Sequence, residues 1–158
     1  MSLSNVQNQL KGTELEEKII VLQESSATVD LAAEALHCEA DRIAKTLSFL
    51  VEDTPVLVVV SGKSKVDNKK FKEYFHTKAK MIAYEEVEEW IGHAPGGVCP
   101  FAVKENVKIY LDRSLKKYEV VYPAAGSGNS AIELTIDQLE RFSAYTAWVD
   151  VCKEMEQS

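Results

Sequence analysis

The chain has 158 residues, of which 46% are hydrophobic and 27% are charged, and its formal net charge is −7. This length predicts a single domain whose core covers about two thirds of the surface of the unfolded chain. The composition excludes disordered and fibrous proteins, and no apolar run reaches the ~20 residues of a membrane span. The acidic balance argues against nonspecific binding to a nucleic-acid backbone such as DNA.

The N-terminal residues and the cysteines indicate a reducing compartment. Residues 1–12 are polar and lack the apolar core of a signal peptide. The three cysteines form no CxxC pair, and an odd number gives no closed disulfide framework. We therefore expect a cytoplasmic protein. No set of His, Cys and carboxylate residues has the spacing of a zinc site, and we expect neither a metal nor a cofactor.

The first part of the chain predicts a short helix, a strand and a second helix. Residues 3–12 form the first helix, and the short β-branched run at 17–23 forms the strand. Thr28 is placed to cap the second helix. Apolar residues then recur at helical spacing, at Val29, Ala32, Ala33 and Leu36.

The next two runs, 44–49 and 56–60, predict a hairpin. The sequence 52–55 (EDTP) between them is a turn signal. The second run is apolar on both faces, as expected of a strand in the centre of a sheet or barrel wall.

A lysine stands on the apolar side of the first of these strands. Side chains alternate along a strand, so Lys45 points the same way as Leu47 and Phe49, and Ala44 and Thr46 point the other way. Removing an ammonium group from water costs several kcal/mol or lowers its pKa. Lys45 therefore either keeps its head in solvent at the mouth of the strand or binds an anion, and the second case is a site.

The second half of the chain alternates short helices and short strands irregularly. Residues 67–75 and 84–91 predict helices, the latter ended by Gly92, and residues 80–82 predict an edge strand. Thr135 and Gln138 match a capping box. The remaining elements are strands at 107–111, 119–122 and 131–134, a helix at 136–142 and a closing strand at 148–152.

This irregular order does not fit a doubly wound sheet, in which strands and helices alternate regularly. It predicts an α+β fold, namely a mixed, largely antiparallel, β-barrel-like sheet surrounded by short helices.

Two glycine-containing loops are candidates for holding an oxygen. Gly96 and Gly97 permit a close approach of backbone N–H groups to a ligand, and the run from Gly126 to Ser130 could hold a carbonyl or phosphate similarly. The alternative for the first loop is a plain glycine turn. Neither loop matches a P-loop or a GxGxxG fingerprint, which excludes the usual nucleotide-binding motifs.

Cys99 is the candidate nucleophile for a cysteine hydrolase. Activation would need a base, and the histidines available are His37, His76 and His93. The alternative is that Cys99 is a small buried hydrophobic residue and that His93 is a helix cap or surface residue.

A basic segment interrupts the acidic chain. Residues 63–80 contain seven lysines, and their local net charge of +5 leaves −12 for the other residues. Such a segment is either a solvated helix surface or a face that attracts phosphate.

Several motifs together resemble the YbaK/EbsC family, the freestanding relatives of the editing domain inserted in bacterial prolyl-tRNA synthetase. The resemblance spans about 17–152, and its motifs follow the family order: AKTLSF (44–49), DNKKF (67–71), GHAPGGVCPF (92–101), YLD (110–112) and AAGSGNSAIEL (124–134). It implies a mixed-sheet barrel with outer helices, as expected above. It also implies an activity, hydrolysis of the ester that joins a wrong amino acid to tRNA, chiefly tRNA(Pro).

The resemblance also implies residue roles. Lys45 matches the essential strand lysine of the family, Gly96, Gly97 and Pro100 match its GGxxP loop, and Gly126 matches a later loop glycine. Cys99 and Ala102 depart from the serine and glycine of many members. Members specialised for cysteinyl-tRNA carry serine and aspartate where this chain has Ala124 and Ala131, which favours alanine or another small amino acid here.

From these correspondences we hypothesise a site. The catalytic residues are Lys45, which holds the substrate carbonyl or terminal phosphate, and Gly96 and Gly97, whose loop orients the ester and a water. The expected tRNA-binding residues are Lys63, Lys65, Lys69, Lys70 and Lys72. The expected substrate-binding residues are Thr46, Val98, Cys99, Pro100, Phe101, Ala124, Ala125, Gly126, Ser127 and Asn129.

The expected function is trans-editing of mischarged tRNA(Pro). Such editing is needed because a synthetase pocket built for proline cannot strongly reject smaller amino acids by binding alone. The expected partners are the mischarged tRNA(Pro) and, as further candidates, prolyl-tRNA synthetase or an elongation factor. Two alternatives stay open. The chain could bind aminoacyl-tRNA or a synthetase without hydrolysis, or it could be a Cys99-dependent hydrolase.

Overall fold

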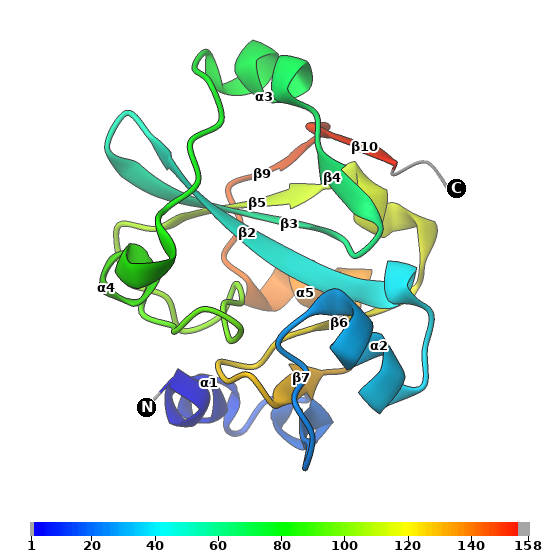
Figure 1. Cartoon of the computed structure of the whole chain (residues 1–158). Coiled ribbons are helices and arrows are strands. Elements are labelled where there is room, and N and C mark those ends of the chain that lie inside the picture. Colours follow the sequence, from blue (N-terminus) through cyan, green and yellow to red (C-terminus); the bar gives the residue numbers. More distant parts are fainter. Residues whose placement is uncertain (1, 155–158) are drawn as a thin grey trace.

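A mixed six-stranded sheet in the order β8-β6-β2-β3-β5-β9 lies at the centre of the computed structural model, which describes residues 2–154. The sheet curls into a half-barrel, and short helices lie around it (Figure 1). Two further two-stranded sheets pair β1 with β7 and β4 with β10. The expected α+β architecture is confirmed, although three of the five pairings in the main sheet are parallel.

The bounds of the elements follow. The strands are β1 (Ile19–Val21), β2 (Ile43–Val51), β3 (Thr54–Ser61), β4 (Ser64–Val66), β5 (Lys108–Asp112), β6 (Val120–Pro123), β7 (Ser130–Ile132), β8 (Leu134–Thr135), β9 (Ala147–Val149) and β10 (Cys152–Glu154). The α-helices are α1 (Ser2–Leu10), α2 (Val29–Leu36), α3 (Asn68–Phe75), α4 (Val87–Ile91) and α5 (Ile136–Phe142). The 3₁₀ helices are η1 (Glu16–Lys18), η2 (Ala40–Arg42), η3 (Tyr84–Glu86) and η4 (Arg113–Lys117).

The predicted hairpin is confirmed and is the longest element of the sheet. Strand β3 pairs antiparallel with β2 along its whole length, from Ala44 opposite Ser61 to Val51 opposite Thr54. Glu52 and Asp53 form the turn with positive φ angles of 49° and 64°. Two consecutive positive φ angles give the turn geometry that suits the right-handed twist of the paired strands.

The helix ends follow the predicted capping signals. The Thr28 hydroxyl accepts a hydrogen bond from Leu31 N, and the capping box of Thr135 and Gln138 is complete. Gly92 ends α4 as expected, with a φ of 103°, and Asp67, expected as the first residue of a helix, is the N-cap of α3.

Three sequence-based expectations were wrong in detail. The closing strand expected at 148–152 is two strands, β9 and β10, because Val151 turns inward and donates its N–H to the buried Asp112 carboxylate. The edge strand expected at 80–82 is an isolated bridge between Phe49 and Met81. The strand expected at 131–134 is divided into β7 and β8, and the short strand β4 was not predicted.

The core lies on both faces of the sheet. Along β3, Val56, Val58 and Val60 face one apolar cluster, and Leu57 and Val59 face the other. This is the two-sided burial expected of a central strand. Helix α3 covers the smaller cluster through Phe71, whose ring lies 4.8 Å from that of Phe49.

None of the helices in the described part of the chain is long and apolar enough to cross a membrane.

Candidate functional site

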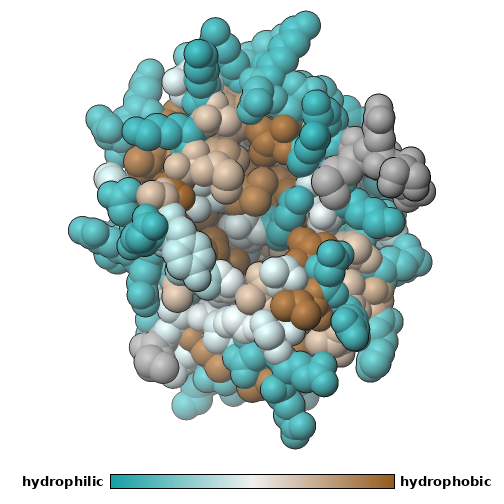
Figure 2. All heavy atoms as spheres, viewed as in Figure 1, coloured by the Kyte–Doolittle hydropathy of each residue, from teal (hydrophilic) through white to brown (hydrophobic). Residues whose placement is uncertain are grey.

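A pocket of about 490 Å³ opens beside β2, between that strand, α2, the start of α4 and the loop that contains Gly96. Figure 2 shows it as a hollow bordered by apolar residues. The wall from the N-terminal half consists of Ser26, Ala27, Thr28, Val29, Ala32, Ile43, Ala44, Lys45, Thr46, Leu47 and Ser48. The remaining wall consists of Met81, Ile82, Tyr84, Val87, Pro95, Gly96, Val98, Tyr122, Ala124, Ser130 and Ala131.

The pocket lies where strand β2 has an open edge. The pairing of β2 with β6 ends at Ala44. On the same edge, hydrogen bonds with the 80–82 segment begin only at Ser48, whose carbonyl accepts from Ile82 N at 3.1 Å. Alternate residues direct their backbone groups to opposite edges of a strand, so the N–H and C=O of Thr46 face this gap and have no strand partner.

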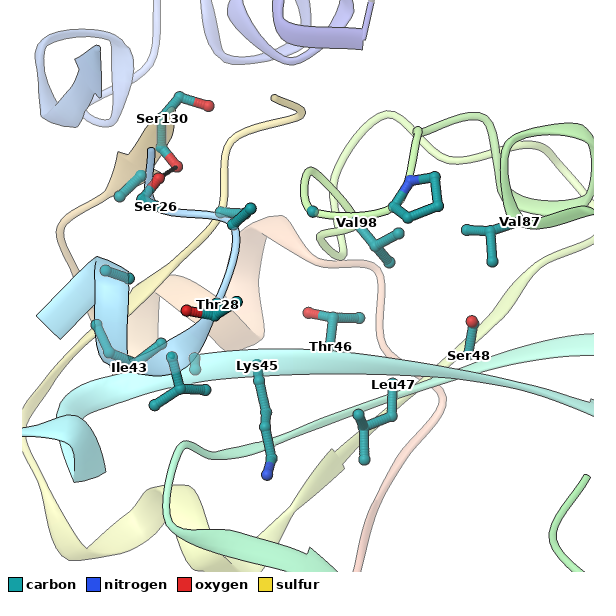
Figure 3. Close-up of a pocket in the computed structure, with 18 of the residues that line it drawn as sticks. Ser26, Thr28, Ile43, Lys45, Thr46, Leu47, Ser48, Val87, Val98 and Ser130 are labelled. Atoms are coloured by element: carbon teal, nitrogen blue, oxygen red, sulfur yellow. Dashed lines mark hydrogen bonds between the residues drawn. The ribbon is translucent and has the colours of Figure 1, made fainter. Parts of the chain in front are cut away.

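The side chains of Thr46 and Ser48 lie on one face of that edge. Figure 3 shows both hydroxyls on the side of β2 that faces Val98 and Val87. Thr46 Oγ1 is buried and has no hydrogen-bond partner in the described part of the chain. Because a buried hydroxyl without a partner is costly, this oxygen is a candidate contact for a bound ligand.

Lys45 leaves the strand on the opposite face. Its side chain extends away from Thr46 and Val98, on the same side as Leu47 (Figure 3). The side expected for Lys45 from strand alternation is therefore the side observed. Burial lowers the pKa of its ammonium group, and the nearby Cys152 acts in the opposite direction. No hydrogen bond or ion pair to Lys45 occurs within residues 2–154.

The 95–98 loop supplies backbone donors to the pocket wall. The N–H of Gly97 is used within the loop, donating to Ala94 O at 3.0 Å. The N–H groups of Gly96 and Val98, two residues that line the pocket, have no partner among the described residues. Such free donors can stabilise a developing oxyanion.

Gly97 and Gly126 are required for the close approach of two loops. A Cβ on Gly97 would lie 2.6 Å from the carbonyl carbon of Gly126, closer than real Cβ contacts allow. Gly126 itself has a φ of +98° and packs against the backbone of Ser2 and Leu3. These glycines therefore hold the pocket wall in place, and neither lines the pocket.

The 124–131 segment contributes small residues to the pocket wall, and the side chains of its loop hydrogen-bond to groups of the protein. Ala124 and Ala131 are bridged to each other and line the wall. The Ser127 hydroxyl lies 2.9 Å from Asn129 Oδ1 and 2.7 Å from Ser130 Oγ. Asn129 also donates its side-chain N–H to Leu22 O. Ser127 and Asn129, expected at the substrate, thus lie outside the pocket wall.

Cys99 and His93 are packed in the core. Cys99 is fully buried, and burial raises the pKa of its thiol to about 12. His93 is also fully buried, which lowers its pKa, and its Nε2 lies 2.6 Å from the Phe101 carbonyl. His93 is therefore not the cap or surface residue expected from its position at the end of a helix. A thiol with so high a pKa is protonated at neutral pH and is a poor nucleophile.

The lysine segment is exposed at four of its five expected tRNA-binding positions. Lys63 precedes β4, Lys65 lies within it, and Lys69 and Lys72 lie on the outer side of α3. Lys70 is engaged in the fold, since its Nζ donates to Asp150 Oδ1 at 3.2 Å and to the Cys152 carbonyl at 3.0 Å.

The structure thus brings part of the expected site together. The expected site residues that line the pocket are Lys45, Thr46, Gly96, Val98 and Ala124. Those behind or beside its wall are Gly97, Cys99, Pro100, Phe101, Ala125, Gly126, Ser127 and Asn129. Ser48 was missed, although strand alternation places it on the same face as Thr46. No pattern in the sequence indicated that α2 would form part of the pocket wall.

Comparison with known proteins agrees with this arrangement. Residues 23–142 match the family model described as "Aminoacyl-tRNA editing domain". The chain is 46% identical over 157 residues to the uncharacterized protein YwhH of Bacillus subtilis, covering 99% of this chain and 100% of YwhH. It is 31% identical over 113 residues to EbsC of Enterococcus faecalis, whose name proposes a Cys-tRNA(Pro)/Cys-tRNA(Cys) deacylase, covering 70% of this chain and 69% of EbsC.

Larger proteins and solved structures extend the comparison. The chain is 30% identical over 125 residues to the proline–tRNA ligase of Lactiplantibacillus plantarum, covering 78% of this chain but only 22% of the ligase. A crystal structure described as a proposed trans-editing enzyme for prolyl tRNA synthetase superposes with a TM-score of 0.85 at 29% identity, covering 96% of this chain and 97% of the other. The chain belongs to the aminoacyl-tRNA editing domain family and, with it, to the aminoacyl-tRNA hydrolases.

Proposed function

We propose that this protein hydrolyses the ester of mischarged tRNA(Pro), and that the amino acid removed is alanine or another small one. The observation that carries the proposal is the pocket on the open edge of β2, where Thr46, Gly96 and Val98 present polar groups without protein partners. The names of the relatives EbsC and proline–tRNA ligase support tRNA(Pro) as the RNA. The activity would belong in the cytoplasm, with prolyl-tRNA synthetase or an elongation factor as further candidate partners.

Ester hydrolysis at this pocket needs a positioned water and donors for the developing oxyanion. In our proposal the free N–H groups of Gly96 and Val98 hold the ester oxygen, and the Thr46 hydroxyl orients the aminoacyl group or the water. An aminoacyl ester is already activated, so no covalent nucleophile is required. Donors fixed in place before the reaction stabilise the transition state without reorganisation.

In our proposal Lys45 binds a phosphate of the substrate rather than its ester. Because its side chain lies on the face of β2 opposite Thr46 (Figure 3), it would not share the ester carbonyl with the Gly96 loop. The ammonium could instead hold the terminal phosphate of the RNA where the substrate passes over the open edge. Of the two partners expected for Lys45 from the sequence, the substrate carbonyl and the terminal phosphate, we therefore propose the phosphate.

The small-residue wall supports selection by size. Ala27, Ala32, Ala124 and Ala131 line the pocket, and none of them offers a polar group to a cysteine or serine side chain. In our proposal the amino-acid side chain lies against these four alanines, where selection is by volume. A synthetase pocket built for proline cannot make this selection against smaller residues.

The direct test is deacylation of alanyl-, cysteinyl-, seryl- and prolyl-tRNA(Pro) by the wild-type protein. We expect alanyl-tRNA(Pro) to be hydrolysed and prolyl-tRNA(Pro) to persist, because the pocket would admit the smaller group in a reactive position. Initial rates on radiolabelled RNA, corrected for spontaneous hydrolysis, measure the difference. Turnover of none of the four esters, with RNA binding retained, would contradict the proposal and favour a binding module that does not hydrolyse aminoacyl-tRNA.

The pH dependence of deacylation tests the role of Lys45. Its pKa is lowered by burial, so its charge is lost as pH rises through a value below that of an exposed lysine, which is about 10.4. If the charged form holds phosphate, kcat/KM falls over that alkaline range. We expect Lys45→Ala to lower kcat/KM about 10- to 100-fold, since a charged hydrogen bond contributes about 1.5–3 kcal/mol.

Lys45→Arg is the matched control for that experiment. Arginine stays charged, so the alkaline fall should be absent while the overall rate is reduced. An unchanged alkaline fall in Lys45→Arg would show that another group titrates, and wild-type activity in Lys45→Ala would remove Lys45 from the mechanism.

Cys99→Ala separates the proposal from the cysteine-hydrolase alternative. We expect kcat/KM within about threefold of wild type and a loss of roughly 1–2 kcal/mol in the free energy of unfolding, since the sulfur fills core space. Deacylation assays and urea titrations measure the two effects. Loss of activity in a variant with a wild-type circular dichroism spectrum would restore Cys99 as a candidate nucleophile.

A further inference from the structure

An apolar lip borders the pocket at residues 81–84. Tyr84 and Met81 are the two most exposed of the large apolar side chains in the described part of the chain, at 74% and 59%. Both also line the pocket, so they stand at its mouth. Exposed apolar residues at the mouth of a binding pocket are candidates for ligand contact.

Tyr84 differs from every other tyrosine of the chain. The other five have a partner: Tyr74 and Tyr110 pack edge to face, and the hydroxyls of Tyr118, Tyr122 and Tyr145 donate to carboxylates. Within residues 2–154, the Tyr84 ring stacks on no other ring and its hydroxyl has no hydrogen-bond partner. The ring is therefore available to a ligand.

The backbone holds the lip in place. Met81 is bridged to Phe49 of β2, and Leu50 N donates to Lys80 O at 2.9 Å. Beyond it, η3 begins at Tyr84 and is closed by a hydrogen bond from Glu86 N to Ala83 O at 2.8 Å. An aromatic side chain with only two rotatable bonds on a fixed backbone loses little entropy when a ligand stacks on it.

The volume of the pocket exceeds what an amino acid needs. The pocket of about 490 Å³ falls within the range of about 300–1,000 Å³ that is typical of small-molecule sites. It therefore has room for an alanyl ester together with an adjoining part of the substrate.

The charges around the lip favour a neutral ligand on Tyr84. Four exposed glutamates follow it, at Glu85, Glu86, Glu88 and Glu89. Two exposed lysines, Lys78 and Lys80, precede it. A phosphate on the Tyr84 ring would meet carboxylates, whereas a nucleobase carries no net charge. Phosphates further along the RNA can lie toward the lysines.

We propose that Tyr84, supported by Met81, is the stacking platform for the terminal nucleobase of the tRNA acceptor strand. The inference rests on the proposed function and names the part of the RNA that the pocket mouth binds. Stacking of a base on an aromatic side chain contributes enough affinity to change binding about tenfold or more. The platform positions the adenosine so that its aminoacyl ester reaches the open edge of β2.

A double-mutant cycle on protein and RNA tests this inference by binding alone. The probe is uncharged tRNA(Pro) transcript, intact or lacking its terminal adenosine. We expect the wild type to bind the intact RNA about tenfold more tightly than the shortened RNA. Tyr84→Ala should bind both RNAs with the affinity that the wild type has for the shortened one.

Three further variants isolate the aromatic face. Tyr84→Phe keeps the ring and should stay within about twofold of wild type, whereas Tyr84→Leu keeps an apolar side chain without the ring and should behave like Tyr84→Ala. Tyr74→Ala removes an exposed tyrosine that does not line the pocket and should leave the difference between the two RNAs unchanged.

The outcomes separate this inference from the proposed function. Hydrolysis of mischarged tRNA by the wild type, together with no coupling between Tyr84 and the terminal adenosine, would overturn the platform alone. Coupling without hydrolysis would support the platform while the proposed function fails. A change in sedimentation mass in Tyr84→Ala, with unchanged RNA binding, would mean that the lip contacts a second copy of the chain and would overturn the inference.

Discussion

The structure depends on an interruption in strand pairing. Strand β2 pairs with β3 from Ala44 to Val51, but on its other edge it pairs only at 43–44 and from Ser48 onward. Unpaired backbone groups in a protein interior are costly, and proteins rarely leave them without a partner or solvent. Here the gap opens into a pocket, so that the edge can be satisfied by water or by a ligand. The pocket wall and its lip are arranged around this gap.

The hairpin makes that gap possible. Because β3 is buried on both faces, the β2–β3 pair is anchored in two apolar clusters and can leave part of its outer edge free. The tight contact of Gly97 with Gly126 then brings two loops that are distant in sequence to the pocket wall. The site therefore consists of a rigid strand that carries polar groups, with small residues and backbone donors opposite it.

The sequence predicted the elements better than it predicted their surroundings. Strand alternation fixed the side of Lys45, and capping residues such as Thr28 and Thr135 fixed helix starts, because both signals are local. A buried Cys99 was one of the two interpretations of the sequence, but the burial of His93 could not be predicted, since it depends on how the chain packs around it. The open edge of β2 could not be predicted either, because the residue pattern of one strand does not show where the neighbouring strands separate from it.

Amide hydrogen exchange at Thr46, followed by nuclear magnetic resonance, tests whether the open edge of β2 binds the substrate. We expect fast exchange of this N–H in the free protein and slow exchange of neighbouring β2 amides that pair with β3. Exchange at Thr46 should become slower when a non-hydrolysable analogue of aminoacyl-adenosine is added. A Thr46 amide that is already protected in the free protein, or that does not respond to the bound analogue, would contradict the claim that the open edge of β2 binds the substrate.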